Sequence, residues 1–117
     1  MKSYTDIEQS RKLGEILPLE SADMCFINNK PQLGFLCEEY YEFGDTILQD
    51  YYPCWSFAAL FEVLPDGTDV TKDKSDTENE KYMCTVLVND SLVTTFANNP
   101  VDVCVEMILK LHKQNLL

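Results

Sequence analysis

Residues 53–65 read PCWSFAALFEVLP, a largely apolar stretch bounded by two prolines. It contains the only tryptophan, Trp55, and a proline at each end, while Ser56 and Glu62 alone interrupt its apolar character. An apolar run of this kind is typical of a short helix buried on most of its circumference. We therefore expect a helix from Trp55 to Leu64 that packs at the centre of the core.

The segments that follow indicate a hairpin and a further helix. Residues 82–88 and 92–96 are rich in valine, threonine and aromatic side chains, and residues 89–91 between them predict a turn. Asn99 followed by Pro100 is typical of a helix start, because Asn caps well and Pro fits the first helical position.

The segments that precede residues 53–65 predict a helix and short strands. Thr5 and Glu8 have the spacing of a capping box, so a helix is expected from near Thr5 to Pro18. Apolar residues ending at Ile27 and a second run over 33–37 are strand candidates. The order of elements predicts an α+β fold, a small and largely antiparallel sheet with helices packed on one face.

The chain of 117 residues is expected to form a single globular domain, residues 1–117, with a mobile acidic loop at about 66–81. Its 20 acidic and 9 basic residues give a net charge of −11 at pH 7. This charge repels nucleic acid and anionic membranes, so we expect no direct binding to either. The chain contains no signal-peptide pattern and no apolar run of about 18 residues, so the expected location is the cytoplasm.

The cysteines do not form a disulfide or metal-binding pattern. Their number is odd, and apolar or aromatic residues lie close to each, so we expect buried free thiols. The positions are Cys25, Cys37, Cys54, Cys84 and Cys104.

Candidate chemistry is sparse. His112 is the only histidine, and no metal-ligand spacing or phosphate-binding loop occurs, so neither a catalytic constellation nor a cofactor is expected. Glu20 and Asp23 lie close together and could perform acid–base work in a pocket if the fold buried them. Side chains of this region more commonly cap or turn the backbone, and we favour that interpretation.

An acidic and aromatic stretch at residues 38–52 is the candidate partner-binding segment. It contains five carboxylates and no lysine or arginine. Trp55 is either a core anchor or part of the same surface, because aromatic side chains are enriched both in cores and at interface hot spots. The candidate partner-binding residues are Glu38, Glu39, Tyr40, Tyr41, Glu42, Tyr51, Tyr52 and Trp55.

Several short blocks of the chain together resemble a known family. They are Ser21-Ala22-Asp23-Met24, Pro53-Cys54-Trp55-Ser56, Leu64-Pro65, Asn99-Pro100-Val101-Asp102 and Glu106-Met107-Ile108. In this order they resemble short uncharacterised proteins encoded by phages and mobile elements of gut Bacteroidales bacteria, over most of the chain from Leu17 onward. The resemblance implies an accessory role in a bacterial host, and it carries over no catalytic residue because the family has no assigned activity.

We therefore expect a non-enzymatic accessory or interaction protein that binds a host or phage protein. One alternative is a small-molecule or nucleotide binder, or an enzyme, with a pocket near Asp23 and Trp55. Others are an acidic mimic of nucleic acid and an oligomeric structural protein. The sequence leaves the partner and the oligomeric state open.

Overall fold

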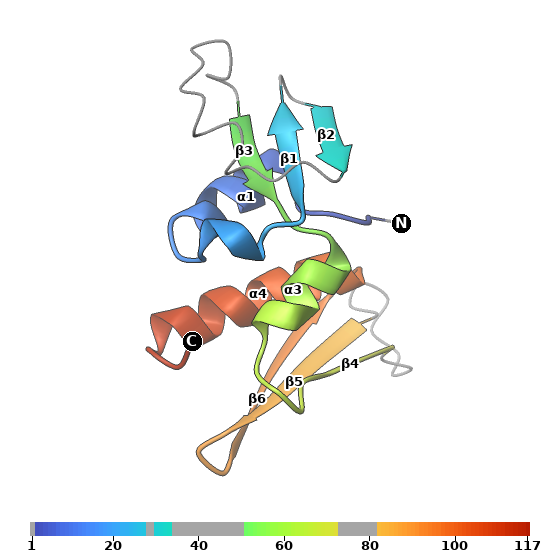
Figure 1. Ribbon diagram of the computed structural model, residues 1–117. Helices are drawn as coiled ribbons and strands as arrows, with labels where there is room; N and C mark the ends of the chain where they lie inside the picture. Colours follow the sequence, from blue (N-terminus) through green and yellow to red (C-terminus); the bar gives the residue numbers. More distant parts are fainter. Residues whose placement is uncertain (1, 28–29, 34–50, 73–81) are drawn as a thin grey trace. The chain divides into compact units, whose positions relative to one another are not determined.

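The computed structural model describes residues 2–27, 30–33, 51–72 and 82–117 (Figure 1). In this part of the chain, helices and antiparallel strands form two compact units, and the predicted α+β class is confirmed. We call Tyr4–Ala59 the N-terminal unit, and Leu60–Leu117 together with Met1–Ser3 the C-terminal unit. The expected small antiparallel sheet is present in each unit, with a helix packed against it. The expectation of a single domain stays a prediction.

The N-terminal unit contains a three-stranded antiparallel sheet in the order β2-β1-β3. Met24 of β1 lies opposite Leu33 of β2 on one side and Cys54 of β3 on the other. Helix α1 packs against β3, and the rings of Tyr4 and Phe26 meet edge to face at 6.1 Å. The elements of the N-terminal unit are α1 (Ile7–Gly14), the 3₁₀ helix η1 (Leu19–Ser21), β1 (Met24–Ile27), β2 (Lys30–Leu33) and β3 (Tyr51–Cys54).

Helix α1 begins one residue later than the capping box at Thr5 predicted. Asp6 is the N-cap: its side chain accepts a hydrogen bond from the backbone N–H of Gln9, and the Gln9 side-chain oxygen accepts one from the backbone N–H of Asp6. Thr5 is fully buried, and its hydroxyl accepts a hydrogen bond from the backbone of Trp55. Asp6 caps α1 in place of Thr5, because the Thr5 hydroxyl is already hydrogen-bonded to the backbone of Trp55.

The helix expected over residues 55–64 is confirmed in a shorter form as α3 (Phe57–Val63). Its expected burial on most of its circumference was wrong: Ala59 and Leu60 are buried, whereas Ala58 and Glu62 are exposed and Phe61 is 41% exposed. Trp55 and Ser56 precede its first turn. Pro65 follows the helix and starts a turn, in which the N–H of Thr68 donates to the Pro65 carbonyl and Gly67 takes a φ of +84°.

The C-terminal unit contains the second antiparallel sheet, in the order β4-β5-β6, with α4 packed against β5 and β6 (Figure 1). The predicted hairpin is confirmed: β5 and β6 flank Asn89 and Asp90, which have φ of 50° and 62°. The predicted cap of α4 is also confirmed, because the Asn99 side chain accepts from the N–H of Asp102 at 2.8 Å. The elements are β4 (Asp69–Lys72), β5 (Tyr82–Val88), β6 (Ser91–Ala97) and α4 (Pro100–Lys113).

Strand β4 lies inside the segment that was predicted to be a loop from about residue 66 to 81. Asp69 pairs with Thr85, and Lys72 pairs with Tyr82. The charged residues of β4 are exposed, which an outer strand tolerates, so their polarity concealed the strand from pattern reasoning. Residues 73–81 lie outside the described part of the chain.

Candidate functional site

The two acidic candidates for a pocket, Glu20 and Asp23, lie in different surroundings. Glu20 is exposed in η1, whereas Asp23 is half-buried. The Asp23 carboxylate accepts hydrogen bonds from the Ser56 backbone N–H at 2.9 Å and from the Ser56 hydroxyl. The Ser56 oxygen in turn accepts from the N–H of Ala59 in the first turn of α3 at 3.3 Å. The Ser56 side chain thus caps α3, and the Asp23 carboxylate holds Ser56 in place.

Trp55 is fully buried, so its interpretation as a core anchor is confirmed and its place among the surface-binding candidates was wrong. Its indole N–H donates to the Ser21 hydroxyl oxygen at 2.9 Å, and the Ser21 hydroxyl donates to the Pro18 carbonyl at 2.6 Å. Both carboxylate oxygens of Asp23 hold Ser56 within the N-terminal unit.

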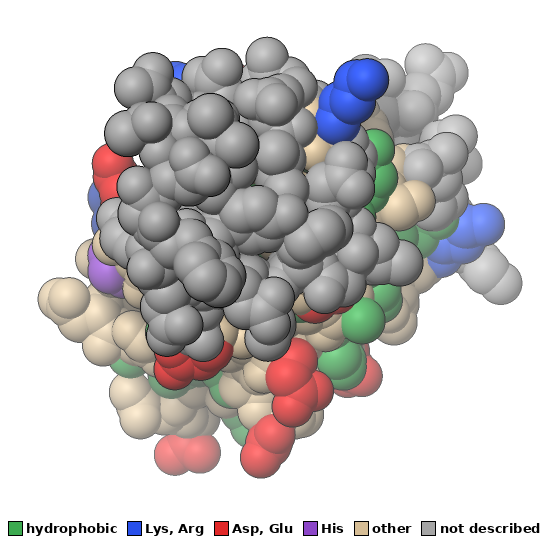
Figure 2. Space-filling model, turned by 45° about the horizontal axis from the view of Figure 1, so that its top comes forward, with side chains coloured by type: hydrophobic (Ala, Val, Ile, Leu, Met, Phe, Trp, Pro, Cys, Tyr) green, Lys and Arg blue, Asp and Glu red, His purple; other side chains and the backbone are tan. Residues whose placement is uncertain are grey.

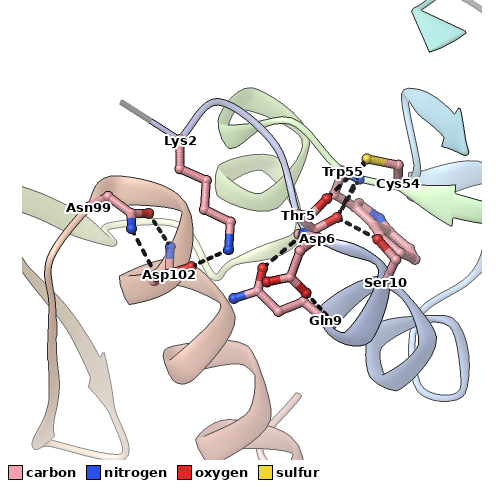
Figure 3. Close-up of polar contacts among 9 residues, drawn as sticks. All are labelled: Lys2, Thr5, Asp6, Gln9, Ser10, Cys54, Trp55, Asn99 and Asp102. Carbon is pink, nitrogen blue, oxygen red and sulfur yellow. Dashed lines mark hydrogen bonds and ion pairs between the residues drawn. The ribbon is translucent and has the colours of Figure 1, made fainter. Parts of the chain in front are cut away.

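Thr5 is the centre of a buried polar cluster in the same unit (Figure 3). Its hydroxyl oxygen lies 2.8 Å from the hydroxyl oxygen of Ser10 and 3.6 Å from the sulfur of Cys54. It also accepts a hydrogen bond from the backbone N–H of Trp55 at 3.1 Å. The Thr5 backbone N–H donates to the Trp55 carbonyl at 2.9 Å. One side chain thus connects the segment before α1, α1 itself and the end of β3.

A second polar cluster, in the C-terminal unit, joins the first residues of the chain to the start of α4 (Figure 3). The Lys2 ammonium forms an ion pair with Asp102 at 2.8 Å, and the Asn99 amide donates to the other Asp102 oxygen at 2.8 Å. Both charged side chains are partly exposed, so this pair contributes little more than a surface ion pair. We assign it a local structural role.

Tyr52 is the one candidate partner-binding residue, apart from Trp55, whose side chain the structure describes. It is half-buried, its hydroxyl accepts from Arg11 at 2.6 Å, and the Arg11 guanidinium lies 4.8 Å from the centre of its ring. Tyr52 and Arg11 line a shallow groove of about 500 Å³ with Gly14, Leu19 and Pro53. Tyr51 belongs to β3, and Glu38, Glu39, Tyr40, Tyr41 and Glu42 lie outside the described residues.

The two faces of the hairpin β5–β6 differ in burial. Cys84 and Val86 of β5 and Thr95 of β6 are buried on the face that α4 covers, and the Thr95 hydroxyl donates to the Val103 carbonyl of α4 at 3.1 Å. Because successive side chains of a strand alternate, the residues between them lie on the opposite face, which we call the outer face. The register places three directly opposed pairs there: Met83 with Phe96, Thr85 with Thr94, and Leu87 with Leu92.

The outer face exposes large apolar side chains. Leu87 is 63% exposed, Leu92 70% and Phe96 41%. Val86, Leu87 and Val88 place apolar side chains on both faces of β5, a pattern typical of a central strand, and β5 is central in the order β4-β5-β6. The sequence pattern did not reveal that no described residue covers the outer face of β5. The periodicity of a strand shows which residues share a face, but it does not show what packs against that face.

The outer edge of β6 and the neighbouring side of α4 form a second groove of about 480 Å³. Lys110 crosses it, and its ammonium donates to the Thr94 carbonyl at 3.4 Å. Glu106 and Lys113 also line this groove, so it contains both signs of charge. Among the described strands, none pairs with this edge of β6.

Cys84 of β5 and Cys104 of α4 form a buried pair of thiols. A hydrogen bond from the Cys104 thiol lowers the pKa of Cys84, against the opposing influence of burial and of the Asp69 carboxylate. The same hydrogen bond and burial raise the pKa of Cys104 strongly. Burial is confirmed for the four cysteines that the structure describes, and Cys37 lies outside them.

No protein-family model, no curated protein and no solved structure matches the chain. Within the described ranges, no helix is long and apolar enough to cross a membrane. In those same ranges, no group of three or more His, Cys, Asp or Glu side chains is arranged to hold a metal ion.

Proposed function

We propose that the protein is a non-enzymatic interaction protein that binds a second, different protein through the outer face of the β4–β6 sheet. Its setting is the phage or mobile element of a bacterial host that the sequence resemblance implies, with a host or phage protein as the partner. The observation that supports the proposal most is the exposure of the opposed pair Leu87 and Leu92.

Single exposed apolar residues are common on protein surfaces, but neighbouring ones signal interaction sites. Here the apolar pair Leu87–Leu92 lies two positions along the hairpin from Met83–Phe96, with Thr85 and Thr94 between them. Binding of an apolar partner surface would remove both leucines from water, at roughly 25 cal/mol for each Å² of apolar area buried. A flat, rigid strand pair also loses little conformational entropy on binding.

The charges around the outer face indicate the chemistry of the partner. Asp69 of β4 lies on this face opposite Thr85, and Asp90 is exposed in the hairpin turn. More generally, Figure 2 shows Asp and Glu side chains along the lower border of one view of the molecule, in keeping with the net charge of −11 of the whole chain. The complementary partner has an apolar patch bordered by lysine or arginine, which would also be steered towards this chain at low salt.

The test is an affinity capture from a Bacteroidales host lysate, with mass spectrometry, comparing matched variants. The double variant Leu87→Ser/Leu92→Ser removes the apolar pair, and Leu117→Ser is its control because Leu117 is also exposed, at 41%, but lies at the end of the chain. A third variant carries Glu38→Gln, Glu39→Gln and Glu42→Gln in the acidic stretch. We expect one stoichiometric protein that is captured by the wild type, the control and the glutamine variant but lost with the double variant.

Two results would overturn the proposal. One is the capture of no stoichiometric protein by the wild type. The other is a captured protein that is lost with the glutamine variant and kept by the leucine variant, which would place binding on the acidic stretch instead.

A further inference from the structure

We infer that the outer edge of β6 pairs antiparallel with β6 of a second copy, around a twofold axis at Thr94. The inference concerns the edge of the sheet, whereas the proposed function concerns its outer face, so either can fail without the other.

The composition of β6 is the first observation. The strand reads SLVTTFA and contains no charged residue and no proline. Edge strands usually carry a lysine, a proline or a bulge that prevents pairing with another chain. β6 has none of these, although 25% of the chain is charged. Its edge is therefore suited to pairing.

The direction of the backbone groups fixes the register. The Thr94 carbonyl accepts from Lys110, so it points away from β5 to the outer edge. Backbone groups of alternate residues point to the same edge of an antiparallel strand, so Leu92 and Phe96 share this direction with Thr94. Pairing of Thr94 with its own copy makes all three residues members of hydrogen-bonded pairs, with about six backbone hydrogen bonds.

This register also matches the side chains. Leu92 of one copy lies opposite Phe96 of the other, and the established pairs Leu87–Leu92 and Met83–Phe96 extend the two rows. Each apolar row then runs from Leu87 and Leu92 of one copy to Phe96 and Met83 of the other copy. A row of four threonines, Thr85 and Thr94 of each copy, lies between the two apolar rows. The exposed apolar pairs of one chain thus become continuous across a six-stranded sheet. Cross-strand apolar contacts of this kind stabilise sheets.

The charges beside the edge are compatible with a second copy. Pairing places the groove along α4 next to its symmetry mate. Lys110 contacts Thr94 and so lies near the axis, while Glu106 and Lys113, on either side of it along α4, each face the opposite charge of the other copy. The long contact from Lys110 to Thr94 involves an exposed side chain and is easily exchanged for one with Glu106, one turn earlier on α4. This strip carries two lysines and one glutamate, so it lacks the acidic excess that would make two copies repel.

The first test is sedimentation of Thr94→Lys and of its control, Thr85→Lys. Thr94→Lys brings two like charges together at the axis, whereas Thr85→Lys makes the same change on the same face, one strand away from the edge. We expect the wild type and Thr85→Lys to sediment as dimers at tens of micromolar, and Thr94→Lys as a folded monomer. A monomeric wild type up to the millimolar range, open-ended aggregation, or a dimeric Thr94→Lys would overturn the inference.

A second test reads the register and does not depend on how the lysine variants fold. With oxidised glutathione as the acceptor of two electrons and two protons, Thr94→Cys should cross-link into a covalent dimer, because paired Cα atoms lie within disulfide reach. Ser91→Cys should not, because the two copies of residue 91 would lie roughly 20 Å apart. Equal cross-linking of both variants, or none with Thr94→Cys, would contradict the proposed axis.

The two proposals remain distinguishable. A dimeric wild type that captures no other protein would support the inference and contradict the proposed function. A captured protein together with a wild type that stays monomeric would do the opposite.

Discussion

At the scale of single residues, Thr5 shows how a polar side chain can be misassigned from sequence. Thr5 and Glu8 match the capping-box pattern, but the hydroxyl of Thr5 is buried between Ser10 and Trp55. The pattern records only spacing along the chain, whereas the acceptor that Trp55 requires is set by a contact across 50 positions. The start of α1 was predictable to within one residue, and the role of Thr5 was not.

Thr5→Val tests the polar cluster around Thr5. Valine has nearly the shape of threonine, but it leaves the backbone N–H of Trp55 and the Ser10 hydroxyl without their buried partner. We expect the free energy of unfolding to fall by about 1–3 kcal/mol, the usual cost of buried groups that lose a hydrogen bond. Urea denaturation measures it, and Thr71→Val in exposed β4 is the control. Equal stability of the wild type and Thr5→Val would show that the cluster contributes nothing.

The buried thiols allow a second prediction at this scale. In Cys104→Ala the hydrogen bond that lowers the pKa of Cys84 is lost, while burial and the Asp69 carboxylate still raise it. The pKa of Cys84 should therefore rise, which the pH dependence of the ¹³Cβ chemical shift of Cys84 in the folded protein would show. Cys25→Ala, in the N-terminal unit, should leave that titration unchanged. An unaltered titration in Cys104→Ala would contradict the pairing.

At the scale of elements, local signals worked where the chemistry is local. Asn99 and Pro100 predicted the start of α4, and the Asn89-Asp90 turn predicted the hairpin, because caps and turns depend on adjacent residues. β4 was missed because its exposed, charged residues satisfy no alternating pattern, and its existence depends on pairing with β5. Similarly, the sequence indicated that Asp23 accepts a backbone hydrogen bond, but its donor, Ser56, lies 33 positions away and could not be named.

The hairpin turn provides the prediction for this scale. Asp90 has a φ of 62°, a left-handed conformation that costs energy for any residue with a Cβ atom and little for glycine. Asp90→Gly creates the Asn-Gly sequence preferred in two-residue hairpins, so the free energy of unfolding should rise by about 0.5 kcal/mol. Asp90→Val should lower it, and thermal denaturation compares both with the wild type. A destabilised glycine variant would show that the turn differs from the one described.

At the scale of the whole molecule, the order of the expected elements predicted the α+β class, but composition and charge gave no location for a site. The charge of −11 directed attention to the carboxylates of residues 38–52, whereas the described surface feature that stands out is apolar, Leu87 beside Leu92. Charge is additive and can be counted from sequence. Exposure of a leucine depends on what the fold places over it, which no pattern in β5 reveals.

The central claim is that the outer face binds a different protein, and site-specific photocrosslinking tests it most directly. Leu87, Leu92 and, as a control, Leu117 would each be replaced in turn by photoreactive benzoylphenylalanine in host cells. The account predicts that positions 87 and 92 capture the same protein, one with a basic border around an apolar patch, and that position 117 does not. No product from either leucine of the hairpin, the same product from all three positions, or only a second copy of this chain would contradict it.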